Sequence, residues 1–539
     1  MSQVEQVRAS APWSAPPQGS AVGGVPRTPP ATGASTTPLP ERVIEIAFAY
    51  RKRILGGLLL IYLLGFNAQW RPTPDSALYL TIGRNLFENK GFTFHGQVNQ
   101  LSYPGIPLLI AATFKLFHSE SLTPLLVEMF LGGLLGLALV YRLFLLHDGP
   151  KMAVWMTLGV ALCALFHRYC YELLTDMPFF IGVMGFFAGW EGVFGSRGLD
   201  CRLGSLRRAR WYDWAILVAG LAIAILTRPQ MWALLLAAII MLGAQLKQRA
   251  GGRPLILLAA IVGIAALAWK LDRRRHDGSI FGHYEGAIIW NISQNGPAFL
   301  HRVFVEYIPR LFEGVLSQTM FGCRFGTGLD ALVGVSVIVA AVVFLKAEPI
   351  WRIWVGMLLL TTVVAAEPID RYFLSALPML VYAWWKALVW LQDRLPKPWG
   401  SYALLLVLGI GGGTNLARAL IFTFEQRRVP FLNAYAQGHF ARLDEVARLI
   451  NQHVPEDGYV LAPPHTPRIL TYLSRRNVLE PITEHAPNDH AHPVYLLQPM
   501  NEPAARRLKE MGARLGEQVG PTVQGKYDVW ILNRVEWGS

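Results

Sequence analysis

Long apolar runs recur along residues 54–422, and short charged clusters separate them. A transmembrane helix needs roughly 20 predominantly apolar residues, with about 17 as a lower limit. The pattern therefore predicts an all-α polytopic membrane protein with about eleven transmembrane helices. The expected spans are 54–70, 124–146, 152–168, 177–195, 212–227, 230–246, 254–270, 328–346, 350–366, 372–391 and 401–422.

The apolar stretch 104–117 is shorter than these runs and contains two prolines. Stretches of about 10–14 apolar residues more often lie at the membrane interface than cross the membrane. Charge favours the interfacial alternative, because lysine and arginine concentrate in cytoplasmic loops. With 104–117 at the interface, the basic clusters 51–53, 202–210 and 247–253 all fall on the cytoplasmic side. The N-terminus is then cytoplasmic, and the chain leaves its last span on the opposite face.

Both ends of the chain differ from the apolar region. Residues 1–40 are rich in proline, serine, alanine, glycine and threonine, which predicts a disordered cytoplasmic tail. Residues 425–539 alternate short strand patterns, such as GYVLA and PVYLL, with helical patterns such as ARLDEVARLINQHV and EPAARRLKEMGARL. This alternation predicts a small soluble α/β domain on the extracytoplasmic face. Residues 41–424 form the predicted transmembrane domain, in which 71–123 is the first external loop.

Composition agrees with a membrane protein, since 53% of the residues are hydrophobic and only 16% are charged. The net charge of +13 does not indicate nucleic-acid binding, because the basic residues lie in short clusters between apolar runs. The four cysteines include no CxxC pair, which argues against a zinc site or a disulfide framework. The sequence also contains no phosphate-binding glycine loop and no metal-spaced His/Cys cluster.

The expected topology places several ionisable residues at the extracytoplasmic ends of spans, where charge is costly and is a functional hypothesis by default. Asp75 begins PDSALYLTIGRNLFENKGF and could simply cap a surface helix whose Leu78 and Ile82 face lipid. Asp176 could cap a span, and Arg228 could snorkel toward water. The chemical alternative is a site in which a carboxylate acts as general base and arginines bind a phosphate.

Five segments in this order resemble landmarks of the GT-C glycosyltransferases, in particular the dolichyl-phosphate-mannose protein mannosyltransferase and lipid A aminoarabinose transferase (ArnT-like) group. PDSALYLTIGRNLFENKGF resembles the family's first external loop, and SYPGIPLLIAATFKLF resembles its juxtamembrane Tyr-Pro-Pro helix. ELLTDMPFF, ILTRPQMWALLL and DRYFLSALPML resemble later landmarks, so the resemblance covers about residues 50–390. Two positions depart from the family pattern. Ser76 follows Asp75 where many members have a second acid, and Gly105 replaces the second proline.

The resemblance implies a membrane glycosyltransferase in which an extracytoplasmic acceptor attacks C1 of a polyprenyl-phosphate-linked sugar with inversion. It implies Asp75 as catalytic base or acceptor-orienting carboxylate, Asp176 as a second carboxylate in the cavity, and Arg228 and Arg371 as candidate ligands of the donor phosphate. The other residues expected to line the cavity are Arg84, Tyr103, Glu172 and Tyr372.

The expected partners are the lipid-linked sugar donor, an acceptor that is a protein, a lipid or an envelope glycan, and the lipid bilayer of the inner (plasma) membrane. No cofactor is expected. A divalent metal is possible but not favoured, because only one carboxylate remains in the first loop. Two alternatives stay open: a lipid or sugar transporter or flippase, and a catalytically inactive GT-C-like binding protein. Transporters tend to contain paired broken helices in repeated halves, and the sequence contains no visible repeat.

Overall fold

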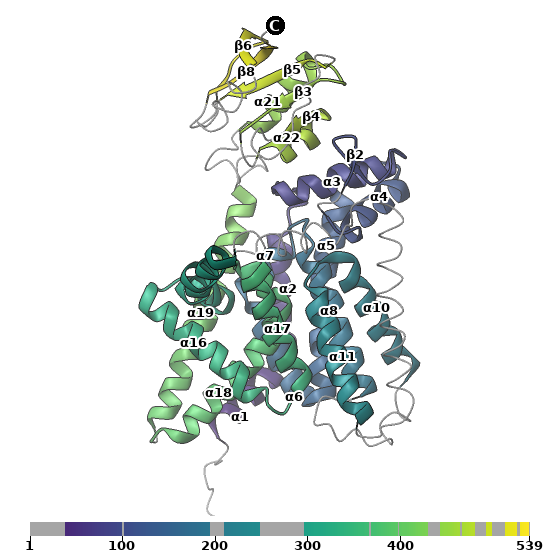
Figure 1. The fold of residues 1–539 in the computed structure, drawn as a ribbon. Coiled ribbons are helices and arrows are strands. Elements are labelled where there is room, and N and C mark those ends of the chain that lie inside the picture. Colours follow the sequence, from purple (N-terminus) through teal and green to yellow (C-terminus); the bar gives the residue numbers. More distant parts are fainter. Residues whose placement is uncertain are drawn as a thin grey trace, which may run out of the picture.

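A bundle of long helices forms the body of the molecule, a layer of shorter helices lies across one end, and a sheet with helices lies beyond that layer (Figure 1). The structure is a computed structural model. It describes residues 38–99, 102–194, 210–247, 296–365, 368–396, 398–428, 442–463, 466–479, 492–498, 513–524 and 529–537.

The bundle combines long helices with shorter and less regular ones. Its main helices are α1 (Leu39–Ala49), α2 (Arg51–Gly65), α5 (Thr123–His147), α6 (Pro150–Leu162), α7 (Ala164–Tyr169), α8 (Asp176–Val193), α10 (Trp211–Thr227), α11 (Met231–Lys247), α16 (Thr327–Phe344), α17 (Pro349–Ala365), α18 (Leu377–Arg394) and α19 (Trp399–Arg428). The less regular elements are η1 (Val303–Tyr307), α14 (Ile308–Arg310), η2 (Leu311–Val315), α15 (Leu316–Phe321) and the 3-10 helix η3 (Asp370–Ala376).

Four helical segments in the described residues are long and apolar enough to cross a membrane, and each coincides with a predicted span. They are Thr123–His147, Thr327–Phe344, Asp370–Arg394 and Trp399–Glu425. The chain is therefore a multi-pass membrane protein. Other predicted spans coincide with shorter helices; for example, the extended backbone of Cys163 separates α6 from α7. The predicted span 254–270 lies outside the described residues, so the count of eleven stays a prediction.

Helices α8 and α10 approach each other closely because glycine lies at their contact. A Cβ atom added to Gly182 would lie only 2.7 Å from the backbone nitrogen of Ala224. Small residues of this kind allow helices in membranes to pack backbone against backbone. Because α8 begins at Asp176 and α10 ends just before Arg228, the antiparallel contact brings these two charged side chains together.

The layer at the end of the bundle contains α3 (Pro74–Phe87) and α4 (Gly105–Phe117), which pack against each other. Helix α4 has 13 residues and is thus about 20 Å long. This length is well below the hydrocarbon thickness of about 30 Å. It agrees with the expectation that 104–117 does not cross the membrane.

A short hairpin, β1 (Thr93–Phe94) with β2 (Gln97–Val98), completes the layer. Its two turn residues, His95 and Gly96, both have positive φ (51° and 75°), as tight two-residue hairpin turns require. Phe94 covers Leu78 and Ile82, which are buried. The expectation that these two side chains face lipid was therefore wrong, because the hairpin occupies that side of α3.

The C-terminal part contains a mixed sheet of order β4-β3-β5-β8-β6, with β7 paired to β8. Strands β4, β3 and β5 are parallel, whereas β8 is antiparallel to β5, β6 and β7. Its strands are β3 (Tyr459–Leu461), β4 (Asn477–Leu479), β5 (Val494–Gln498), β6 (Ala513–Gln518), β7 (Val523–Gln524) and β8 (Val529–Trp537), and its helices are α21 (Leu443–His453) and α22 (Pro467–Ser474).

The pattern EPAARRLKEMGARL predicts a helix that ends at Leu515, but the described end of this segment belongs to β6. The prediction was wrong there because pairing with β8 determines the backbone conformation of these residues. The division of the chain at residue 424 and the extracytoplasmic location of the C-terminal part stay predictions.

The C-terminal part packs on the layer formed by α3. Leu80 of α3 and Leu470 of α22 share one hydrophobic cluster. The Trp70 and Tyr472 rings also meet edge to face, with centroids 5.1 Å apart. The sheet and its helices therefore lie at the same end of the bundle as the first loop (Figure 1).

Candidate active site

The start of α3 is capped by Thr73 rather than by Asp75. The Thr73 hydroxyl accepts a hydrogen bond from the Ser76 backbone N–H (3.0 Å), and the Ser76 hydroxyl accepts one from the Thr73 N–H (2.9 Å). This reciprocal capping box leaves the Asp75 side chain outside the cap. The capping alternative for Asp75 was therefore wrong, and Ser76 has a structural role.

The Asp75 carboxylate instead binds two arginines from distant segments. Its Oδ2 accepts from Arg371 Nη2 at 3.1 Å, and its Oδ1 accepts from Arg468 Nη1 at 3.3 Å. Arg371 lies in η3, directly before α18, and Arg468 lies in α22 of the C-terminal part. With 32% of its side chain exposed, Asp75 remains open to small molecules from outside.

A second ion pair lies deeper, between α8 and α10. Arg228 Nη1 donates to Asp176 Oδ1 at 2.8 Å, and the two side chains are only 9% and 1% exposed. The other carboxylate oxygen, Asp176 Oδ2, is buried without a hydrogen-bond partner among the described residues. The Asp176 carboxylate binds Arg228, and Arg228 does not extend to water. The expectations that Asp176 caps a span and that Arg228 snorkels were therefore wrong.

Tyr372 connects the two ion pairs. Its ring centroid lies 5.3 Å from the guanidinium carbon of Arg228 and 5.6 Å from that of Arg371, within the range of cation–π attraction. Arg371 also lies within electrostatic reach of both Asp75 and Asp176. The structure thus brings together the predicted carboxylates and arginines.

Three further charged residues surround Glu172. Glu172 accepts a hydrogen bond from Arg168 Nε at 2.7 Å and lies 4.0 Å from Arg71 Nη1. Asp370 lies within electrostatic reach of Arg168, Glu172 and Asp176. Glu172 therefore belongs to a second charged group at the border of the site.

One predicted lining residue, Arg84, lies elsewhere. Arg84 donates to Glu120 (2.8 Å) and to the Tyr472 carbonyl (2.9 Å), and its guanidinium stacks over the Tyr472 ring. It therefore holds the C-terminal part on α3 rather than reaching Asp75. Tyr103 is buried in the hydrophobic core of the bundle.

A cavity of about 570 Å³ opens beside Asp370. Its wall combines three cations, Arg168, Arg324 and Arg418, and two carboxylates, Asp370 and Glu425, with apolar side chains that include Phe422. Cationic and apolar groups side by side suit an anion that carries an apolar tail. Across the described ranges, no group of three His, Cys, Asp or Glu side chains is placed to hold a metal ion.

Comparison with solved structures shows that the chain shares its fold with ArnT and with an archaeal oligosaccharyltransferase, both GT-C glycosyltransferases. The chain is similar to ArnT from Cupriavidus metallidurans bound to undecaprenyl phosphate, with a TM-score of 0.55 and 14% identity over 90% of this chain and 98% of that one. The apo state of that protein gives a TM-score of 0.55 at 13% identity, with the same coverage. An oligosaccharyltransferase from Archaeoglobus fulgidus in the apo form gives 0.51 at 13% identity, over 84% of this chain and 70% of that one.

No family model matches the sequence, and no curated protein sequence is similar to it. The likeness is therefore one of fold, and at that level it confirms the resemblance inferred from the five sequence segments.

Proposed function

We propose that the chain is a membrane glycosyltransferase that moves a sugar from a polyprenyl-phosphate-linked donor to an extracytoplasmic acceptor, with Asp75 as general base. The observation that carries the proposal is the position of Asp75. It is a partly exposed carboxylate beside Arg371, at the mouth of a site that also holds the buried Asp176–Arg228 pair. The fold supports the donor class, because the similar ArnT structure was determined with undecaprenyl phosphate.

In the proposed reaction, an acceptor hydroxyl or amine attacks C1 of the sugar while the bond from C1 to the phosphate oxygen breaks. The acceptor proton passes to the Asp75 carboxylate. The leaving phosphate gains negative charge, which arginine can stabilise through bidentate hydrogen bonds. Arg371 suits this role because its Nε is buried without a hydrogen-bond partner among the described residues and can donate to a phosphate oxygen. Arg228 is the second proposed phosphate ligand.

The cavity beside Asp370 supports a lipid-linked donor. Arg324 and Arg418 offer positive charge next to the apolar side chains of Ile421 and Phe422. A polyprenyl phosphate has the same combination of a charged head and an apolar chain.

One observation favours an alternative, a catalytically inactive binding protein. Asp75 already binds both Arg371 and Arg468. A carboxylate that keeps both arginines cannot readily accept a proton from an acceptor. Under the transferase proposal, the donor phosphate draws Arg371 away from Asp75 before the acceptor is deprotonated.

The test uses the purified full chain in lipid nanodiscs with polyprenyl-phosphate sugars and an extract of envelope acceptors, and it measures release of polyprenyl phosphate. We expect release by the parent protein and a loss of about 10²–10⁴-fold for Asp75→Asn. Asp444→Asn is the matched control, because Asp444 lies in α21 and pairs with Arg448 within the same helix. Equal turnover of Asp75→Asn and the parent would refute the base assignment. If no polyprenyl-phosphate sugar is consumed, the transferase proposal is wrong.

A further inference from the structure

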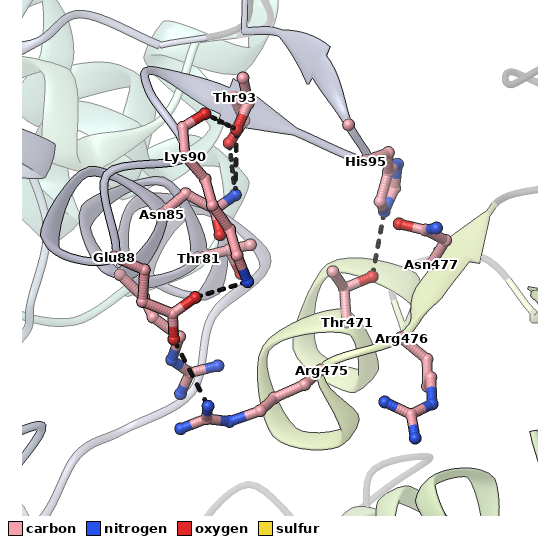
Figure 2. Close-up of a pocket in the computed structure, with 12 residues that line it drawn as sticks. Thr81, Asn85, Glu88, Lys90, Thr93, His95, Thr471, Arg475, Arg476 and Asn477 are labelled. Carbon is pink, nitrogen blue, oxygen red and sulfur yellow. Dashed lines mark hydrogen bonds and ion pairs between the residues drawn. The ribbon is translucent and has the colours of Figure 1, made fainter. Parts of the chain in front are cut away.

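A second cavity, of about 360 Å³, lies between the α3 layer and the C-terminal part (Figure 2). One wall comes from α3 and the hairpin, with Asn85 and Thr93 among its residues, and the other comes from α22 and β4, with Thr471 and Asn477. The volume falls within the range of about 300–1,000 Å³ that is usual for small-ligand sites. Because the walls belong to segments far apart in the sequence, the cavity exists only where the C-terminal part is docked.

The residues that line this cavity are almost all polar or charged. Apart from Gly96, every lining residue has a polar or charged side chain, and the two walls together supply five threonine and asparagine side chains (Thr81, Asn85, Thr93, Thr471 and Asn477). Small-molecule sites are usually lined mainly by apolar side chains. Hydroxyl and amide groups in this number are the partners that a polyhydroxylated ligand requires.

Charge in the cavity is predominantly positive. Glu88 is the acidic lining residue, and it binds Lys90 at 2.6 Å and Arg475 at 3.4 Å. Arg476 also lines the cavity, and its Nε donates to a backbone carbonyl, that of Val454, at 2.8 Å.

The remaining lining cation, Arg84, shares Glu120 with Arg475, each at 2.8 Å. Two carboxylates therefore face four cationic side chains around this cavity. The excess of positive charge favours an anionic ligand.

His95 joins the two walls without adding charge. Its Nε2 lies 3.0 Å from the Thr471 hydroxyl, as Figure 2 shows. Burial, together with the positive charge of Arg468, lowers the pKa of His95 to about 3. The imidazole is thus neutral at physiological pH and contributes a hydrogen bond.

The cavity lies close to Asp75. Thr81 follows Asp75 by six positions in α3, which is about 9 Å along the helix. Thr471 follows Arg468, the partner of Asp75, by three positions in α22, which is about 4.5 Å. The cavity and the Asp75 carboxylate thus lie along the same two helices, α3 and α22, within about two helical turns of each other.

We propose that this cavity is a subsite for an anionic saccharide, whose phosphate or carboxylate binds Lys90, Arg475 and Arg476 while its hydroxyls bind the threonines and asparagines. The inference rests on the proposed function, because it identifies the acceptor as a negatively charged glycan or glycolipid sugar. The reacting hydroxyl belongs to the part of the acceptor that reaches Asp75.

The experiment measures equilibrium binding to the full chain in nanodiscs of neutral phosphatidylcholine, with glucose 6-phosphate and glucose as probes. We expect glucose 6-phosphate to bind at least about tenfold more tightly than glucose, since hydrogen bonds to charged groups are the stronger ones. The variant Lys90→Gln/Arg475→Gln is expected to lose about tenfold or more of that affinity. Both side chains are more than half exposed, at 65% and 53%, so we expect the variant to fold.

Two controls test whether the loss of glucose 6-phosphate affinity is specific to the positive charges of this cavity. Lys115→Gln/Arg448→Gln removes two exposed cations outside the cavity and is expected to keep the parent affinity. Lys90→Arg keeps the charge and is expected to keep the affinity as well. Absence of glucose 6-phosphate binding, or equal affinity in the parent and the cavity variant, would overturn the subsite.

The two proposals fail separately. If glucose 6-phosphate binds as expected but no polyprenyl-phosphate sugar is consumed, the subsite is supported and the transferase proposal is wrong. If sugar transfer occurs at equal rates in the parent and the cavity variant, and glucose 6-phosphate does not bind, the subsite is wrong and the transferase proposal remains.

Discussion

The two carboxylates of the candidate active site occupy different surroundings. Asp176 is almost fully buried and binds one arginine, Arg228, which directly follows the neighbouring helix α10. Asp75 is partly exposed and binds two arginines, one of which, Arg468, comes from the C-terminal part. The first pair lies within the helix bundle, whereas the second lies where three separate segments meet.

This difference separates a structural ion pair from an exchangeable one. A buried charge that loses its partner keeps its desolvation cost, so both members of the deep pair must stay. At a partly exposed position, water or a ligand can replace a lost partner, and the pair contributes little to stability. The Asp75–Arg371 pair can therefore open for a donor phosphate, while the Asp176–Arg228 pair holds α8 and α10 in position. Four experiments can break or sharpen this comparison.

The largest effect is expected for Arg228→Met. The substitution leaves Asp176 buried without its arginine, and breaking a buried pair in this way costs about 3–5 kcal/mol. The thermal unfolding midpoint in nanodiscs should fall markedly. The double variant Asp176→Asn/Arg228→Met removes both charges and should recover much of the loss. Equal destabilisation of the single and double variants would show that packing, rather than the unpaired charge, causes the effect.

Next in size is Arg371→Gln, measured as turnover of a polyprenyl-phosphate sugar. Removing a donor that stabilises transition-state charge typically costs about 10²–10³-fold in rate. Stability should change little, because the Arg371–Asp75 pair is partly exposed. Arg371→Lys keeps the charge without the planar fork and should lie between the two rates. Parent-like turnover of Arg371→Gln would remove this arginine from the proposed phosphate site.

The alternation of spans predicts that the ends carrying Asp75, Asp176, Arg228 and Arg371 share one face, and these side chains do meet. Counting the spans is enough for that conclusion, because each span takes the chain to the opposite face of the membrane. Thr73 was also within reach of sequence reasoning. It directly precedes a proline, which favours the first helical position and so marks the preceding residue as the cap.

Arg468 was not within reach of sequence reasoning. It lies 393 positions from Asp75, on a helix whose pattern describes only its packing within the C-terminal part. The docking of that part on α3 depends on tertiary contacts such as Trp70 with Tyr472. Neither periodicity nor charge clusters encode such a contact, so the second partner of Asp75 and the polar cavity beside it emerge only from the structure.

A smaller effect is expected from His95, which belongs to the same outer region as Asp75. Its folded-state pKa of about 3 lies below the usual value, so the unfolded chain binds the proton more tightly. The resulting stability is present above about pH 6.5 and is lost as the pH falls toward 3. Between about pH 7.5 and about pH 5.5 the loss is about 1 kcal/mol.

His95→Gln should remove this part of the pH dependence of the unfolding midpoint. His453→Gln is the control, because His453 is exposed at the end of α21. A pH profile of His95→Gln that matches the parent would show that His95 is not held neutral in the folded chain.

The smallest effect is expected for Arg468→Gln. Both side chains of the Arg468–Asp75 pair are about one-third exposed, and exposed pairs contribute about 0.2–1 kcal/mol. The unfolding midpoint should fall slightly, and less so at high salt, because salt screens exposed charges. The exposed pair of Arg448 with Asp444 provides the matched control in Arg448→Gln. If Arg468→Gln destabilised the chain as strongly as Arg228→Met, the Arg468–Asp75 pair would contribute as much to stability as the buried Asp176–Arg228 pair. Asp75 would then not be the carboxylate that exchanges its partner for a ligand.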